Sequence, residues 1–156
     1  MTTVYCDMDG VLADFDSHHE TVFGTRACKV ADNVDWKAVR GSPGFYSDIP
    51  PMRDMRQLWD YLWALTPKPI ILTGVPRSVP EAPDNKRGWV VKHLGPDVEV
   101  RCCLSREKSL HAQPGAVMVD DWAKYKDLWL AKGGRWITHT SAAETIRQLG
   151  AMGIRP

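Results

Sequence analysis

The sequence lacks several features that would assign it to well-known classes of protein. No apolar run approaches the roughly 18 residues that a membrane-spanning helix requires, and the N-terminus has no signal-peptide pattern. Neither GxGxxG nor GxxxxGKS/T occurs, so dinucleotide-binding and P-loop folds lose their main support. The formal net charge is only +1, with both signs interspersed, so the charge distribution does not favour binding to a polyanion or to a membrane surface. We therefore expect a cytoplasmic protein that binds neither membranes nor, stably, nucleic acid.

Cysteines are few, and their spacing fits no metal or redox motif. Cys6, Cys28, Cys102 and Cys103 match neither a zinc pattern nor CxxC. We interpret them as reduced and mostly buried thiols. Internal repeats and low-complexity tracts are also absent.

Short apolar runs alternate with amphipathic segments along the 156 residues. Strands are expected at 2–6, 70–72, 98–103, 116–119 and 135–138. Helices are expected at 16–23, 52–65, 85–94, 123–132 and 141–149. This alternation predicts an α/β fold, a doubly wound, Rossmann-like parallel sheet of five strands with helices on both faces. The exception is 16–51, which has poor periodicity and many Gly and Pro breakers, and which we interpret as a small insertion after the first strand of a single domain.

The first strand ends in two aspartates, Asp7 and Asp9, followed by Gly10. Residues two apart on a strand share a face, and at a strand tip both carboxylates can turn toward one point. Two anions at such a short distance repel each other unless a cation lies between them, and oxygen ligands favour Mg²⁺. Gly10 permits the sharp exit of the chain. The competing interpretation is a solvated Asp-Gly turn.

Polar residues also follow the other predicted strands. Thr73 follows the second, Lys108 lies between the third and fourth, and Asp120 and Asp121 end the fourth. In a parallel sheet the carboxyl ends of the strands meet in one crevice. This set of groups suits phosphoryl transfer through an aspartyl nucleophile, with a lysine and a hydroxyl offsetting the phosphoryl charge.

In their order along the chain, these residues resemble the haloacid dehalogenase superfamily of phosphatases. Within it, the chain is most similar to the 5'(3')-deoxyribonucleotidases. The matching strings are 7–15 (DMDGVLADF), 43–45 (PGF), 89–90 (WV) with 93–96 (HLGP), 105–108 (SREK) and 119–121 (VDD). Together they extend over most of the chain, as one catalytic domain over 1–156 with a reduced cap at about 16–51.

The resemblance implies a role for each acid. Asp7 would be the nucleophile and first metal ligand, and Asp9 the general acid and base, with its backbone carbonyl on Mg²⁺. In the acid pair, we favour Asp121 as metal ligand with Asp120 as its close support, and leave the choice open. The implied substrate is a nucleoside monophosphate, of the deoxyribonucleotide class.

The resemblance also assigns the phosphate and base contacts. Thr73 and the Gly74 amide would hold the transferring phosphate, although the family has a small hydroxyl residue where this chain has Gly74. Lys108 would steady the nucleophile and phosphate. Phe15 would line the base pocket or pack as a core residue, and we count Gly10 with the substrate-binding residues.

Other readings remain open. Lys86 could replace Lys108, but it opens a predicted helix, where we expect a solvated side chain. His18 and His19 are adjacent, so on a helix they diverge by about 100° and cannot both face one metal, and we expect them to be solvated helix residues. The protein could instead act on another small phosphate ester, on nucleic-acid 3'-phosphate ends, or as a receiver-type phospho-acceptor switch. The sequence leaves open a homodimer.

Overall fold

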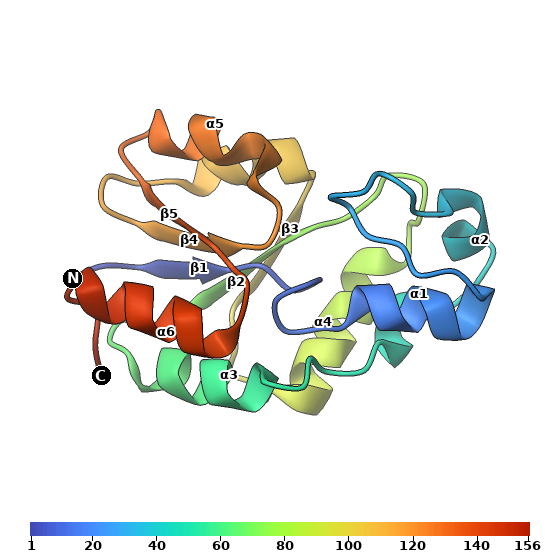
Figure 1. The fold of residues 1–156 in the computed structure, drawn as a ribbon, viewed down its shortest axis with the longest axis horizontal. Helices are drawn as coiled ribbons and strands as arrows, with labels where there is room; N and C mark the ends of the chain where they lie inside the picture. The colour runs from blue at the N-terminus through green and yellow to red at the C-terminus, as the bar shows by residue number, and fades with distance from the viewer.

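Five parallel strands form one sheet in the order β3-β2-β1-β4-β5 (Figure 1). The computed structural model describes residues 1–156. The strands are β1 (Val4–Cys6), β2 (Ile70–Gly74), β3 (Val100–Cys103), β4 (Val117–Asp120) and β5 (Arg135–Thr138). Each predicted strand occurs, with ends that differ from the prediction by two residues or fewer. The predicted α/β, doubly wound parallel fold is therefore confirmed.

Successive strand residues contribute to two different hydrophobic clusters. In β1, Val4 and Cys6 belong to the larger cluster, whereas Tyr5 belongs to the smaller one with Trp129. In β4, Met118 likewise separates from its two valine neighbours. This period of two is what a strand buried on both faces requires. Helices must therefore cover both sides of the sheet.

Helices α3 (Met55–Ala64) and α6 (Ala142–Ala151) pack against each other on one face, and α5 (Lys126–Leu130) lies on the other (Figure 1). The stripe Met55, Leu58, Trp59 and Leu62 is buried, as its helical spacing predicts. The helix expected at 123–132 is divided into a 3₁₀ turn, η3 (Ala123–Tyr125), and the shorter α5. A further 3₁₀ segment, η2 (Ser105–His111), follows β3.

Helix α4 (Ala82–His93) begins three residues earlier than expected. Pro83 lies in its first turn, where the missing amide proton would have had no helical partner. Its side chains reach η1 (Phe45–Asp48), which belongs to the inserted segment. None of the helices is long and apolar enough to cross a membrane.

The inserted segment, residues 16–51, is hereafter called the insert. It carries most of α1 (Phe15–Phe23), then α2 (Trp36–Arg40) and η1. It lies beside α4 at the side of the molecule opposite the two termini (Figure 1). Phe45, Tyr46 and Ile49 join the main hydrophobic cluster, so the insert and the sheet share a core.

Two predictions about side-chain burial are wrong, one for the adjacent histidines and one for the cysteines. His18 and His19 are buried, not solvated. The Nδ1 of His19 donates to the carbonyl of Thr25 and its Nε2 accepts from the amide of Asp35, so this ring fastens the loop between α1 and α2. Among the four free cysteines only Cys6 is buried, whereas the other three are partly exposed.

Candidate active site

The sheet order brings the two acidic strand ends into contact. β1 and β4 are neighbours, and the amide of Asp7 extends their ladder by donating to the carbonyl of Val119 at 2.9 Å. The strand order changes direction here, because β2 and β3 lie on one side of β1 and β4 and β5 lie on the other. Ligand sites in doubly wound sheets form at such a switch point. Asp7 therefore stands beside Asp120 and Asp121 although they are far apart in sequence.

Lys108 lies between Asp7 and Asp120. Its Nζ is 3.0 Å from Asp7 Oδ1 and 2.7 Å from Asp120 Oδ2. All three side chains are buried, which strengthens the attraction between their charges. Burial by itself would raise the pKa of Asp7, but Lys108 and Lys29 overcome this and hold that pKa well below its usual range. Asp7 is consequently an ionised, nearly inaccessible carboxylate held by cations.

Lys86 is fully buried, which contradicts the prediction of a solvated side chain at a helix start. Its Nζ donates to Asp9 Oδ2 at 2.7 Å, to Thr73 Oγ1 at 2.9 Å and to the carbonyl of Gly74 at 2.7 Å. Three oxygen acceptors satisfy all three protons of the ammonium group. Helix propensity says nothing of this, because the acceptors come from β2 and from the loop after β1. The site therefore contains both Lys86 and Lys108, not one in place of the other.

Asp121 packs over the glycine that follows the first acid pair. Gly10 has φ +80°, and a Cβ there would lie 2.0 Å from Asp121 Oδ2. Both the backbone angle and the lack of space therefore require glycine at this position. Burial raises the pKa of Asp121 to about 7, with Lys29 opposing and Asp7 and Asp120 adding to the rise. A nearby cation would stabilise the ionised form of this carboxyl group.

The acids fit a divalent metal ion. Asp7, Asp120 and Asp121 each offer a carboxylate oxygen, and these oxygens lie within 4.8 Å of one another. Asp121 Oδ1 is buried and accepts no hydrogen bond. Both oxygens of Asp120, in contrast, are already engaged, one by Lys108 and one by the amide of Trp122 at 2.9 Å. Hard oxygen donors suit Mg²⁺. Within the pair Asp120 and Asp121, it is Asp121 that has a carboxylate oxygen free to bind the ion.

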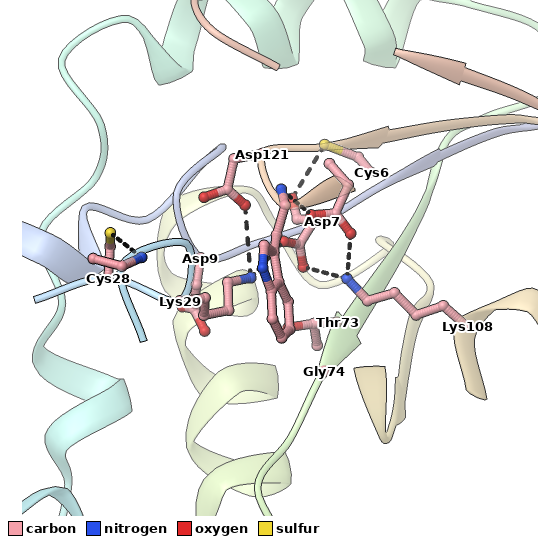
Figure 2. A network of polar contacts seen from close by, with 12 residues as sticks. Cys6, Asp7, Asp9, Cys28, Lys29, Thr73, Gly74, Lys108 and Asp121 are labelled. Atoms are coloured by element: carbon pink, nitrogen blue, oxygen red, sulfur yellow. Dashed lines mark hydrogen bonds and ion pairs between the residues drawn. The ribbon is translucent and has the colours of Figure 1, made fainter. Parts of the chain in front are cut away.

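A third lysine reaches the acids from the insert. Lys29 Nζ is 3.1 Å from Asp7 Oδ2 and 3.6 Å from Asp121 Oδ1, and its side chain is only 18% exposed (Figure 2). The sequence analysis did not identify Lys29, because it lies in a segment without helical or strand periodicity. Only the packing of the insert against the strand ends brings it to this position.

Thr73 and Gly74 end β2 next to the acids. Thr73 is fully buried, and Gly74 has no room for a side chain because a Cβ there would lie 2.2 Å from Ser105 Oγ. The hydroxyl of Ser105 therefore fills the space beside Gly74. Ser105 belongs to one of the strings that carry the family resemblance, although the sequence analysis gave it no role.

A cavity of about 320 Å³ opens above these groups and reaches Asp9. Aromatic rings from the start of α1, from the insert and from the segment after β4 line it: Phe15, Trp36, Tyr46, Trp122 and Tyr125. Lys29, Ser105 and Arg106 add polar groups. Phe15 also packs against Phe45, with ring centroids 5.6 Å apart, so it is at once a wall of the cavity and a core residue. Trp122 directly follows the acid pair, so its place at a strand end could have identified it from sequence.

The predicted site residues thus meet at one edge of the sheet. Lys108 contacts Asp7 (Figure 2) and also Asp120. Lys86 links Asp9 with Thr73 by donating a hydrogen bond to each. Gly10 lies against the side chain of Asp121, and Gly74 lies against that of Ser105. The arrangement can supply a nucleophilic carboxylate, a second carboxylate for proton transfer and fixed positive charge.

The similarity to known proteins identifies the fold of this chain and nothing more specific. No protein-family model matches this chain, and no curated protein matches it either. Two solved structures of L-2-haloacid dehalogenase from Xanthobacter autotrophicus are similar, at 17% identity and TM-scores of 0.54 and 0.52. The second has chloropropionic acid covalently bound. In both cases the match covers 100% of this chain and 85% of the other. This protein therefore has the fold of the haloacid dehalogenases.

Proposed function

We propose that the protein is a Mg²⁺-dependent phosphomonoesterase that hydrolyses nucleoside 5'(3')-monophosphates, with deoxyribonucleotides as the preferred class. The observation that carries the proposal is the position of Asp7. This buried carboxylate lies 3.0 Å from Lys108, and its oxygens fall within 4.8 Å of those of Asp120 and Asp121. The second Xanthobacter structure, which has a similar fold, has chloropropionic acid covalently bound, and this supports a covalent route.

In the proposed reaction, a carboxylate oxygen of Asp7 attacks phosphorus and the ester P–O bond breaks. Asp9 takes up a proton on Oδ1, which accepts no hydrogen bond, when the substrate binds, and delivers that proton to the departing alkoxide oxygen. A water molecule then loses its proton to Asp9 and attacks the phosphorus of the acyl phosphate, which releases inorganic phosphate and restores Asp7. Every proton that leaves Asp9 in the first step is returned in the second.

The remaining groups stabilise charge. Lys108 and the Thr73 hydroxyl, together with the Gly74 amide, would face the equatorial phosphoryl oxygens, where negative charge persists through the transition state. Mg²⁺ bound by Asp7, Asp121 and the Asp9 carbonyl would screen the approach of two anions. Asp120 holds Lys108 in place at 2.7 Å. Lys86 fixes the other carboxylate oxygen of Asp9.

The substrate class rests on the cavity and on the family resemblance. A volume of about 320 Å³ suits a small organic leaving group, and five aromatic rings offer faces on which a nucleobase can stack. The insert would act as the reduced cap that closes over this group. Phe15 would then contact the base.

The test is phosphate release from a panel of ribo- and deoxyribonucleoside 5'- and 3'-monophosphates, with Mg²⁺ or with EDTA. Asp7→Asn serves as the control, because it keeps the shape of the side chain and removes the nucleophile. We expect turnover with Mg²⁺ that falls by at least about a thousandfold in Asp7→Asn. Equal turnover in both proteins would contradict the proposal.

The same panel distinguishes the other readings. An oligonucleotide with a 3'-phosphate tests for a nucleic-acid end, and 2-chloropropionate tests for the reaction that the names of the structural neighbours suggest. A phosphoryl group that persists on Asp7, detected by mass spectrometry after incubation with a phosphodonor, would favour a receiver-type switch. Preference for any of these would replace the nucleotide assignment.

A further inference from the structure

The ammonium group of Lys29 occupies the space toward which the candidate metal ligands point their carboxylate oxygens. Its Nζ lies between Asp7 Oδ2 and Asp121 Oδ1, at 3.1 and 3.6 Å (Figure 2). These two carboxylates belong to the trio whose oxygens lie within 4.8 Å of one another. An ammonium group and a divalent cation favour the same carboxylate oxygens. The two therefore compete for the same space.

The three lysines of the site differ in how firmly they are held. Lys86 donates three hydrogen bonds and is fully buried, and Lys108 is clamped between Asp7 and Asp120. Lys29 donates one hydrogen bond, to Asp7, and keeps 18% of its side chain exposed. It extends from a loop of the insert, whereas Lys86 lies on helix α4 and Lys108 on the 3₁₀ segment η2. Lys29 is thus the one that can leave at least cost.

Charge balance leads to the same conclusion. Asp7, Asp9, Asp120 and Asp121 carry four negative charges when ionised, against three positive charges on the lysines. A divalent cation added beside all three lysines would leave an excess of positive charge in a buried site. Replacing Lys29 by the divalent cation leaves four charges of each sign, and buried charges are tolerated only when they are paired in this way.

We propose that Lys29 and the divalent cation occupy the same position by turns, so that the insert carries an internal competitor for the metal. This inference depends on the proposed function for the identity of the cation. When the metal binds, Lys29 turns toward the cavity, where its Nζ already lies 5.8 Å from the centre of the Trp122 ring. Metal loading then releases the ion pair that holds the insert against the strand ends.

The first measurement is the affinity for Mn²⁺, a divalent probe of Mg²⁺ sites, by electron paramagnetic resonance titration. Lys29→Met removes the competitor and keeps an unbranched side chain. Lys124→Met is the matched control, because Lys124 Nζ lies 5.2 Å from the same Trp122 ring and its loss removes the same charge from the rim. We expect Lys29→Met to bind Mn²⁺ about tenfold more tightly or better, and Lys124→Met to change the affinity by less than about twofold.

The second measurement follows the side chain itself. Acylation of each lysine amine by acetic anhydride, read by mass spectrometry, reports its accessibility in the wild-type protein. We expect saturating Mg²⁺ to accelerate modification of Lys29 several-fold and to leave Lys124 unchanged. If Lys29→Met fails to fold by circular dichroism, Lys29→Gln takes its place in the titration, and the acylation measurement needs no variant.

Equal Mn²⁺ affinity in wild type and Lys29→Met, or an acylation rate of Lys29 that Mg²⁺ does not raise, would overturn the shared position. An equal gain in affinity in Lys124→Met would do so too, since it would indicate only long-range charge. Tighter Mn²⁺ binding by Lys29→Met without any nucleotide hydrolysis would support the shared position and reject the proposed function. Hydrolysis with unchanged Mn²⁺ affinity would do the reverse.

Discussion

The strand ends and the insert contribute to one site by different physical means. At the strand ends, buried carboxylates are paired with Lys86 and Lys108 at distances of 2.7 to 3.0 Å. In the insert, stability comes from aromatic contacts, as in the stacking of Phe23 on Phe45 with centroids 5.4 Å apart. The single strong electrostatic link between the two regions is Lys29. The strand ends therefore form an ionic floor, and the insert forms an aromatic cover that shares its core with the sheet.

If buried ion pairs hold the strand ends, the largest loss of stability should follow Lys86→Met. Asp9 would keep its charge in a buried setting and lose its partner at 2.7 Å, a change that costs about 4 kcal/mol in the free energy of unfolding. Urea denaturation measures this quantity. Lys92→Met, an exposed lysine on the same helix α4, is the control and should cost less than about 0.5 kcal/mol.

A loss from Lys86→Met as small as that from Lys92→Met would mean that the carboxyl group of Asp9 becomes neutral at little cost. The contrast between an ionic floor and an aromatic cover would then fail.

If aromatic packing holds the insert, Phe45→Ala should cost about 3 kcal/mol, because a large buried ring is lost from the shared core. Since Phe45 belongs to the same hydrophobic cluster as the strands of the sheet, we expect one cooperative urea transition at lower denaturant concentration.

Hydrogen exchange shows whether the two regions unfold together. Protection lost only from amides of residues 16–51, with the strands unchanged, would show instead that the insert opens by itself.

The smallest effect should come from a buried polar group outside both regions. His139 follows β5, and its Nδ1 is 2.7 Å from Thr145 Oγ1. Burial lowers its pKa below the ordinary 6.5, with Asp54 opposing. The unfolded chain therefore binds a proton more readily than the folded one, so this residue stabilises the fold above pH 6.5 and that contribution is lost as the pH falls through the lowered pKa.

His139→Asn removes the titration and should cost about 1 kcal/mol at pH 7. The stability of the variant should fall less between pH 7 and pH 5 than that of the wild type. Guanidinium denaturation at a series of pH values measures both quantities. A slope equal to that of the wild type would assign the acid sensitivity to other groups, and His111→Asn, at a more exposed histidine, provides the reference.

The cap of the last helix shows how far local sequence rules extend. Ser141 and Glu144 predict a capping box, and Ser141 Oγ indeed accepts from the amide of Glu144 at 3.2 Å. The side chain of Glu144, however, accepts from Arg147 and Gln148. The start of the helix was predictable from four residues. The partners of Glu144 depended on the donors one turn later, Arg147 and Gln148.

The sequence by itself determined the sheet and the acidic edge at which the candidate site lies. Short apolar runs define the strands, and the acids at the ends of β1 and β4 must meet once those strands are neighbours. The role of Lys29 and the burial of Lys86 could not be predicted, because their partners are remote in sequence and local propensity describes a lysine only as solvated. Only the folded chain, by enclosing unpaired carboxylates, makes the burial of those two ammonium groups favourable.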